Sequence, residues 1–194
     1  MSPAEAAVKR LLDVAASAAA LAVGWPVLLG IALAIRRESP GPALFAQERS
    51  GRRMKPFTMY KFRTMRTGGD PFGESPRTAD DPRLTPLGRW LRETSLDEVP
   101  QLWNVLKGDM SLVGPRPLYM EQARAFTDRQ RRRLEVRPGI TGLAQIQGRG
   151  EVPHERKLEI DVRYVEHMSL LLDLTILART LCRGFGRNTT YQRW

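Results

Sequence analysis

A long apolar stretch near the N-terminus constrains this chain more than any other feature. Residues 11–35 are 25 positions that carry a single charged side chain, Asp13. That length exceeds the roughly 20 apolar residues that a helix needs to cross a bilayer. A secretory signal is disfavoured because the run is too long and is followed by basic residues. The stretch predicts a membrane helix, with a buried core helix as the alternative.

Two features of this stretch favour a helix that enters the membrane and returns to the same face. Pro26 lies near its middle, where a proline kinks or breaks a helix. Basic pairs flank the run at 9–10 and 36–37, and the positive-inside bias draws both ends to the cytoplasm. We therefore predict a re-entrant helix over residues 1–37 broken near Pro26, with a spanning helix as the alternative. Helical spacing would pair Asp13 with one of the two preceding basic residues.

The charge balance points to an anionic partner. The net charge is +10 and the sequence pI is 10.6, which suits nucleic acid, anionic lipid or a phosphorylated substrate. One cysteine, Cys182, excludes an internal disulfide and fits a reducing compartment, and we expect it in the core. The two histidines, His154 and His167, lack companions with ligand-like spacing, which disfavours a zinc site.

Residues 38–194 read as one compact domain. Strand-like runs at 43–47 and 56–62 predict a small β-hairpin. Lys61, Arg63 and Arg66 cluster at its end, either as a solvated basic face or as a phosphate clamp.

The remaining elements of this domain are predicted to be helices. Thr85 followed by Pro86 predicts a helix that begins there and ends near Glu93. Further helices are expected at 102–106, 121–135, 155–167 and 170–185. The last of these either packs on the core or lies in a membrane interface, and Asp173 within it needs a partner or solvent. The fold class is α+β and predominantly helical.

The stretch from 95 to 117 carries the strongest chemical signal. Asp97 and Glu98 are adjacent carboxylates, and a short apolar helix follows them. Arg116 lies between two prolines, which stiffen the backbone that presents it. A catalytic acidic pair is one interpretation. The other is a capping box in which Ser95 and Glu98 merely start a helix.

A glycine-rich stretch at 137–150 completes the pattern. Its glycines and proline predict backbone turns that allow close approach to a ligand, and Arg149 stands exposed between two of the glycines. The pattern matches neither a dinucleotide fingerprint nor a phosphate-binding P-loop.

The motifs at 60–65, 95–117 and 137–149, in this order, resemble the monotopic bacterial phosphoglycosyl transferases. The likeness extends from residue 9 to residue 173 and is to the small form of the family, which consists of the catalytic core. It implies transfer of a phosphosugar from a UDP-sugar to undecaprenyl phosphate, with release of UMP through a covalent aspartyl intermediate. That is the first membrane step in making an O-antigen, a capsule, an exopolysaccharide or a glycoprotein. It also implies a catalytic domain with interfacial amphipathic helices.

The resemblance assigns residues as well. Asp97 is the nucleophile and the position that holds Mg²⁺, and Glu98 is its partner. The further site residues that it implies are Lys61, Arg92, Arg116, Arg149 and Asp173. Arg116 and Arg149 are assigned to the donor's phosphate or nucleotide, and Lys61 and Arg92 to the carboxylates. A carboxylate that attacks a diphosphate meets like-charge repulsion, which a divalent cation and arginines neutralise.

The resemblance places the chain on the cytoplasmic face of the bacterial inner membrane, in contact with phospholipid. The family breaks its helix near a Ser-Pro pair, and here that pair is Trp25-Pro26. A homodimer and the identity of the sugar are left open. A membrane-tethered nucleic-acid-binding domain is the alternative that the net charge suggests, although no helix-turn-helix, RNP or zinc-finger pattern supports it. A scaffold anchored by one true spanning helix is the third hypothesis.

Overall fold

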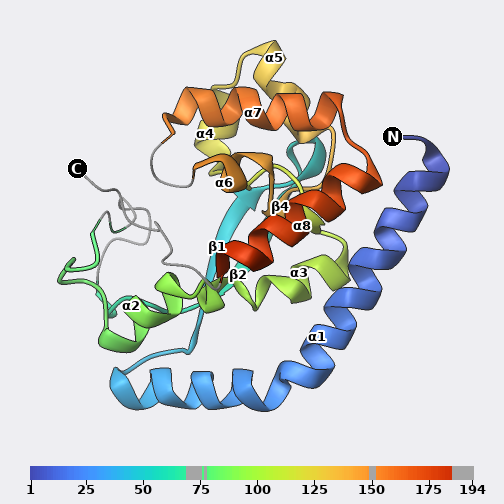
Figure 1. Cartoon of the computed structure of the whole chain (residues 1–194). Helices are drawn as coiled ribbons and strands as arrows, with labels where there is room; N and C mark the ends of the chain where they lie inside the picture. The colour runs from blue at the N-terminus through green and yellow to red at the C-terminus, as the bar shows by residue number, and fades with distance from the viewer. Residues whose placement is uncertain (69–75, 77, 149–151, 185–194) are drawn as a thin grey trace.

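Helix α1, Pro3–Glu38, dominates the computed structural model, which describes residues 1–68, 76, 78–148 and 152–184. It begins with a capping box between Ser2 and Glu5. Figure 1 shows that α1 changes direction about halfway along, and Pro26 is the proline in its interior. A proline supplies no N–H and pushes the preceding turn aside, which accounts for a bend.

The apolar part of α1 is not covered by protein. In its most apolar window of 18 residues, 6% is buried, and its mean hydropathy of 2.2 suits a membrane. The core-helix alternative is therefore wrong. Within the described ranges, α1 is the helix that is long and apolar enough to cross a bilayer.

Polar side chains tie the first turns of α1 to the rest of the chain. Lys9 donates to the Asp173 carboxylate (2.5 Å), and Arg10 donates to two carbonyls at the end of α3, Gln101–Lys107 (2.7 and 3.0 Å). The carboxylate of Asp13 accepts the backbone N–H of Leu112 (3.0 Å). The predicted pairing of Asp13 with a neighbouring basic residue is wrong, because each charge finds a partner in the domain instead.

Arg63 ties down the other end of α1. Its buried guanidinium donates to the carbonyls of Ile35 (3.2 Å), Ser39 (2.7 Å) and Pro40 (2.8 Å), in the last turn of the helix and just beyond it. Arg63 thus caps the end of α1. Together with Lys61 and Arg66 it also lines the cavity described below, so the phosphate clamp stays a prediction.

The predicted β-hairpin is confirmed. Strands β1 (Leu44–Ser50) and β2 (Pro56–Phe62) are antiparallel, and the short 3₁₀ helix η1 (Arg52–Met54) joins them. The side chain of Asn104 on α3 completes the free edge of β2, where its amide bonds both an N–H and a carbonyl of the strand (3.1 and 2.7 Å). Helix α3 therefore lies fixed against the strand that carries Lys61.

Two distant motifs meet in a small parallel sheet. Strand β3 (Ser111–Val113) pairs with β4 (Gly139–Thr141), so the Pro-Arg-Pro segment lies against the glycine-rich stretch. A Cβ added at Gly114 would lie 2.5 Å from the carbonyl oxygen of Arg137, and one at Gly139 would lie 2.1 Å from a backbone nitrogen. These glycines allow the two backbones to approach closely.

Helices complete the domain. Figure 1 shows α7 on the side away from the bend of α1, and α8 starts near the first turns of α1, where Lys9 contacts Asp173, and then runs away from α1. The predicted single helix at 121–135 is wrong, because a capping box at Thr127 divides it. The predicted helices at 86–93, 155–167 and 170–185 are confirmed with small shifts of boundary. The elements are α2 (Pro86–Glu93), η2 (Leu96–Glu98), α4 (Met120–Arg124), α5 (Asp128–Arg131), η3 (Arg132–Leu134), α6 (Leu143–Gly148), α7 (His154–Glu166) and α8 (Leu170–Gly184).

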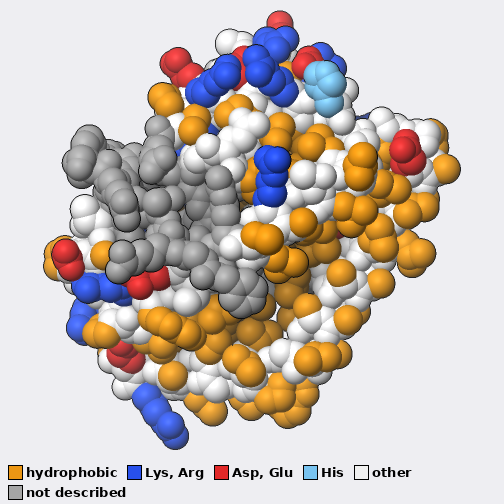
Figure 2. All heavy atoms as spheres, viewed as in Figure 1, with side chains coloured by type: hydrophobic (Ala, Val, Ile, Leu, Met, Phe, Trp, Pro, Cys, Tyr) orange, Lys and Arg blue, Asp and Glu red, His pale blue; other side chains and the backbone are white. Residues whose placement is uncertain are grey.

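Helix α8 has a buried face and an exposed apolar face. Ile176 is fully buried, whereas Leu171, Leu174 and Leu181 are exposed. Figure 2 shows hydrophobic side chains gathered over this part of the surface and along α1. Cys182 is exposed, so the expectation of a core cysteine is wrong.

Candidate active site

A cavity of about 560 Å³ brings most of the predicted site residues together. The hairpin, the α2–η2 segment and helices α6 and α7 all contribute side chains to its wall. The predicted residues that line it are Lys61, Arg92, Asp97, Glu98 and Arg116.

The acidic pair sits on a sharp turn between two helices. Helix α2 ends at Glu93, and Ser95 then adopts a left-handed conformation with φ of 59°. This reverses the chain, and the single turn η2 presents Asp97 and Glu98 before α3 begins. The side chain of Ser95 caps no backbone N–H of η2, so the capping-box interpretation is wrong.

Glu98 is held by two cations. Lys61 Nζ lies 2.8 Å from Glu98 Oε1, and Arg116 Nη2 lies 2.7 Å from the same oxygen. Burial alone would raise the pKa of Glu98, but Arg116 and Lys61 outweigh it and hold the pKa well below its usual range. Burial in turn lowers the pKa of Lys61, while Glu98 raises that of Arg116. Glu98 is therefore an ionised carboxylate whose charge is already compensated.

The carboxylate of Asp97 differs from that of Glu98 both in its hydrogen bonding and in the direction of its pKa shift. No hydrogen bond from another described residue reaches its carboxylate. Burial, and then the adjacent charge of Glu98, raise the pKa of Asp97 to about 6, although Lys61 and Arg92 act to lower it. The pair thus combines one clamped anion with one available carboxylate, an asymmetry typical of catalytic carboxylates.

The donor set fits a magnesium ion that shares its ligands with a substrate. Mg²⁺ in phosphoryl-transfer sites uses one or two carboxylates and completes its shell with water and phosphate oxygens. Asp97 supplies such a carboxylate. Within the described ranges no group of three or more acidic, histidine or cysteine side chains gathers into an all-protein cage.

Several cavity residues were not predicted from the sequence. Arg49 stacks over the ring of Tyr119 (3.6 Å from the centroid), and Lys157 enters from α7. Arg133 pairs with Asp161 (2.6 Å). Arg133 belongs to the basic run 129–133, whose sequence fits either a membrane surface or solvated charge, and it is instead buried.

Among the described residues, one predicted site residue, Asp173, is not brought to the cavity. The carboxylate of Asp173 lies at the junction of α1 and α8, where it accepts from Lys9 and from the hydroxyl of Tyr164 (2.7 Å). The prediction that Asp173 needs a partner is confirmed. Arg149 lies outside the described residues.

Comparison with known proteins identifies the family. The model of the family described as bacterial sugar transferase matches residues 4–187. The sugar transferase EpsL of Bacillus subtilis is 48% identical over 89% of this chain and 85% of its own. The UDP-glucose:undecaprenyl-phosphate glucose-1-phosphate transferase of Escherichia coli is 41% identical over 94% of this chain. The undecaprenyl-phosphate galactose phosphotransferase of Salmonella typhimurium is 38% identical over the same share.

This chain spans 41% of the length of each of these last two relatives. The names of both relatives describe transfer of a sugar phosphate to undecaprenyl phosphate, which agrees with the resemblance of the motifs. The chain belongs to the bacterial sugar transferases, the polyprenyl-phosphate phosphoglycosyl transferases.

Proposed function

We propose that the protein transfers a phosphosugar from a UDP-sugar to undecaprenyl phosphate and releases UMP. The observation that carries this proposal is the asymmetric pair, in which Glu98 is clamped by Lys61 and Arg116 and Asp97 is left available. The names of the relatives support the acceptor and the class of donor.

Asp97 acts as the nucleophile in this proposal. Its carboxylate oxygen attacks the phosphorus that bears the sugar, and the bond from that phosphorus to the UMP oxygen breaks, so UMP leaves with the electron pair. The phosphate oxygen of the lipid then attacks the same phosphorus, and the bond to Asp97 breaks to restore the carboxylate. Two steps let a water-soluble donor and a lipid acceptor use one site in turn.

The cations of the cavity supply the charge that this reaction needs. Attack of a carboxylate on a diphosphate brings negative charges together, and fixed guanidinium and ammonium groups stabilise the resulting transition state. The guanidinium of Arg116 donates to Glu98 and also lines the cavity. This position suits a contact between Arg116 and the donor's phosphate. Lys61 keeps Glu98 ionised, and Arg92 favours the ionised form of Asp97.

Mg²⁺ bound at Asp97, when present, would neutralise phosphate oxygens of the donor. This chain's own part is to keep Asp97 oriented on η2, where no other described residue donates a hydrogen bond to its carboxylate.

The exposed apolar surface of α1 and the exposed leucines of α8 support a membrane arrangement. We propose that α1 enters the bilayer from the cytoplasmic face, bends near Pro26 and returns. The exposed leucines of α8 would lie in the interface beside it. The acceptor's phosphate then meets Asp97 at the boundary between water and lipid.

The test uses purified protein with undecaprenyl phosphate, Mg²⁺ and a panel of UDP-sugars, with UMP release as the readout. We expect release with at least one donor, none with EDTA, and none for Asp97→Asn. With donor alone, mass spectrometry should find a phosphosugar adduct on the peptide that contains residue 97. Full turnover by Asp97→Asn would show that the nucleophile is misassigned.

The nucleic-acid alternative was suggested by the net charge of +10. Three arginines of the basic run 129–133 are already engaged within the protein: Arg129 pairs with Glu159 (3.0 Å), Arg132 with Glu166 (2.7 Å), and Arg133 is buried. A salt-dependent gel shift of duplex or single-stranded DNA at micromolar protein would revive it.

A further inference from the structure

A buried ion pair holds the backbone of Arg116 from behind. Arg133 Nη2 donates to the carbonyl oxygen of Arg116 (2.7 Å) and to Asp161 Oδ2 (2.6 Å). The side chains of Arg133 and Asp161 are 2% and 3% exposed. Two elements far apart in the sequence, η3 and α7, therefore meet at the residue that also grips Glu98.

The segment around Arg116 depends on such external support. Prolines on both sides of Arg116 lack an N–H, so the segment has few donors with which to hold itself. Neighbouring carbonyls are fixed by the backbone N–H of Gly139 to Pro115 (2.9 Å) and by Ser50 to Leu118 (2.9 Å). The carbonyl of Arg116, between them, is held by Arg133.

Stability alone does not explain this pair. A buried ion pair stabilises the fold little more than an apolar pair of the same shape would, because the cost of removing both charges from water offsets their attraction. Here the pair is incompletely satisfied as well, since Arg133 Nε and Asp161 Oδ1 have no hydrogen-bond partner among the described residues. What an apolar pair could not supply is the directed hydrogen bond to Arg116.

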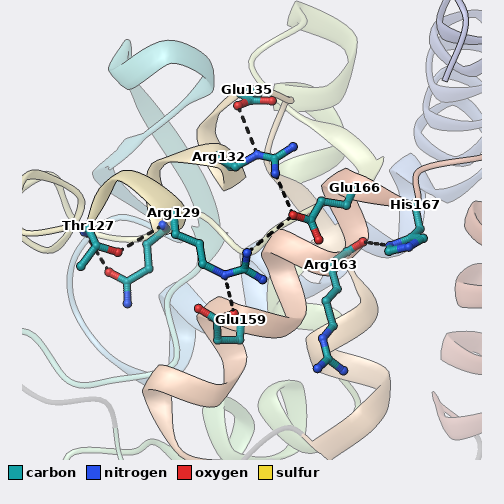
Figure 3. A network of polar contacts seen from close by, with 9 residues as sticks. Thr127, Arg129, Arg132, Glu135, Glu159, Arg163, Glu166 and His167 are labelled. Atoms are coloured by element: carbon teal, nitrogen blue, oxygen red, sulfur yellow. Dashed lines mark hydrogen bonds and ion pairs between the residues drawn. The ribbon is translucent and has the colours of Figure 1, made fainter.

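An outer layer of ion pairs joins the same elements without reaching the cavity. Figure 3 shows Arg129 and Arg132 extending from α5 and η3 to Glu159 and Glu166 on α7. Both arginines are about half exposed, 55% and 45%. Exposed pairs of this kind contribute little to stability, so they provide matched controls on the same interface.

We propose that Arg133 and Asp161 are positioning residues that set Arg116 for the phosphate of the nucleotide. Arg133 fixes the backbone of Arg116, Asp161 fixes Arg133, and Glu98 fixes the guanidinium at the other end. Arg116 is thereby held at both ends, facing the cavity. This inference rests on the proposed function for the identity of the ligand.

The central variant is the double substitution Arg133→Met with Asp161→Leu, which removes both charges together and leaves neither one buried alone. Its first readout needs no substrate: the rate at which phenylglyoxal modifies Arg116, followed by peptide mass spectrometry. We expect that rate to rise about threefold or more, because the loosened backbone exposes the guanidinium more often. Arg132→Gln, the control on the same interface, should match the wild type.

The second readout is the affinity for UMP by calorimetry. We expect the double variant to bind UMP about tenfold more weakly, as for the loss of one charge-assisted hydrogen bond. In an Arg116→Met background the double substitution should cause no further loss, because it acts through Arg116.

Unchanged labelling of Arg116 in a folded double variant would overturn the inference. So would losses of UMP affinity that simply add to those of Arg116→Met. Failure of the proposed function is a different result, because it would appear as wild-type protein that releases no UMP from any donor, with the labelling difference intact.

Discussion

The ammonium of Lys9 lies 2.5 Å from the carboxylate of Asp173, a residue 164 positions further along the chain. Their side chains are 12% and 7% exposed, and the hydroxyl of Tyr164 donates to the other oxygen of the carboxylate. This contact fastens the first turns of α1 to α8. A buried pair of this kind is costly to break from one side, because one charge stays without its partner.

We therefore expect Lys9→Met to destabilise the protein by about 3 kcal/mol in detergent, measured by thermal or denaturant unfolding. The double variant with Asp173→Leu should recover most of that loss. Arg129→Gln, which breaks an exposed pair, should cost less than about 1 kcal/mol. Equal losses for the buried and exposed variants would contradict the anchoring role.

We expect the ionised side chain of Asp97 to lower the stability of the folded protein at neutral pH. Its pKa in the folded protein is about 6, above its ordinary value of 3.8, so ionisation is less favourable in the folded state than in the unfolded one. Stability should fall as the pH rises from about 4 through 6 and stay lower above that. Without divalent cations, Asp97→Asn should be more stable than the wild type at about pH 7.5, by on the order of 2 kcal/mol.

The difference between Asp97→Asn and the wild type should shrink as the pH falls and vanish near about pH 3, where the carboxyl of Asp97 is protonated in the folded state and largely so in the unfolded one. Thermal unfolding at the two pH values checks this. A variant that is no more stable than the wild type at either pH would show that Asp97 is not held in a costly environment.

Lys61 should set the acid limit of the reaction. It lowers the pKa of Asp97 and helps to keep Glu98 ionised. In Lys61→Met the pKa of Asp97 should rise further, so the acid limb of UMP release should move to higher pH and the rate near neutrality should fall. Lys107→Met, at a half-exposed lysine paired with Asp109 away from the cavity, should leave the profile in place. An unshifted acid limb in Lys61→Met would count against Asp97 as the titrating group.

Pro26 should decide the topology of α1. Restoring the missing N–H with Pro26→Ala removes the reason for the bend, and a straighter helix can span the bilayer. The test is labelling of Ser2→Cys by a membrane-impermeant maleimide in intact cells, in a Cys182→Ser background because Cys182 is exposed. We expect protection with Pro26 present and labelling of a fraction of the Pro26→Ala variant. Labelling with Pro26 present would support a spanning helix instead.

Local sequence signals predicted local structure well. The proline and threonine at 85–86 located the start of α2, and strand-like runs located the hairpin. The long helix at 121–135 was predicted from its charged composition, and the capping-box pattern that Thr127 forms with Gln130 was overlooked. That local signal could have predicted the break.

The site was predicted from motifs, and its inner support was not. Asp97, Glu98, Lys61, Arg92 and Arg116 meet in one cavity. Arg133 and Asp161 carry no motif, and a run of arginines is normally solvent-exposed. Asp173 was predicted to bind substrate, but it pairs with Lys9. The sequence identifies a polar residue in an apolar helix, but it does not identify the partner that long-range folding brings to that residue.

Both ends of α1 are fastened to the same body, by Lys9 and Arg10 at the start and by Arg63 at the finish. These contacts fix where the two ends of the helix meet the domain. In the membrane arrangement proposed above, they would also set the distance from the bilayer at which Asp97 meets a lipid-borne phosphate.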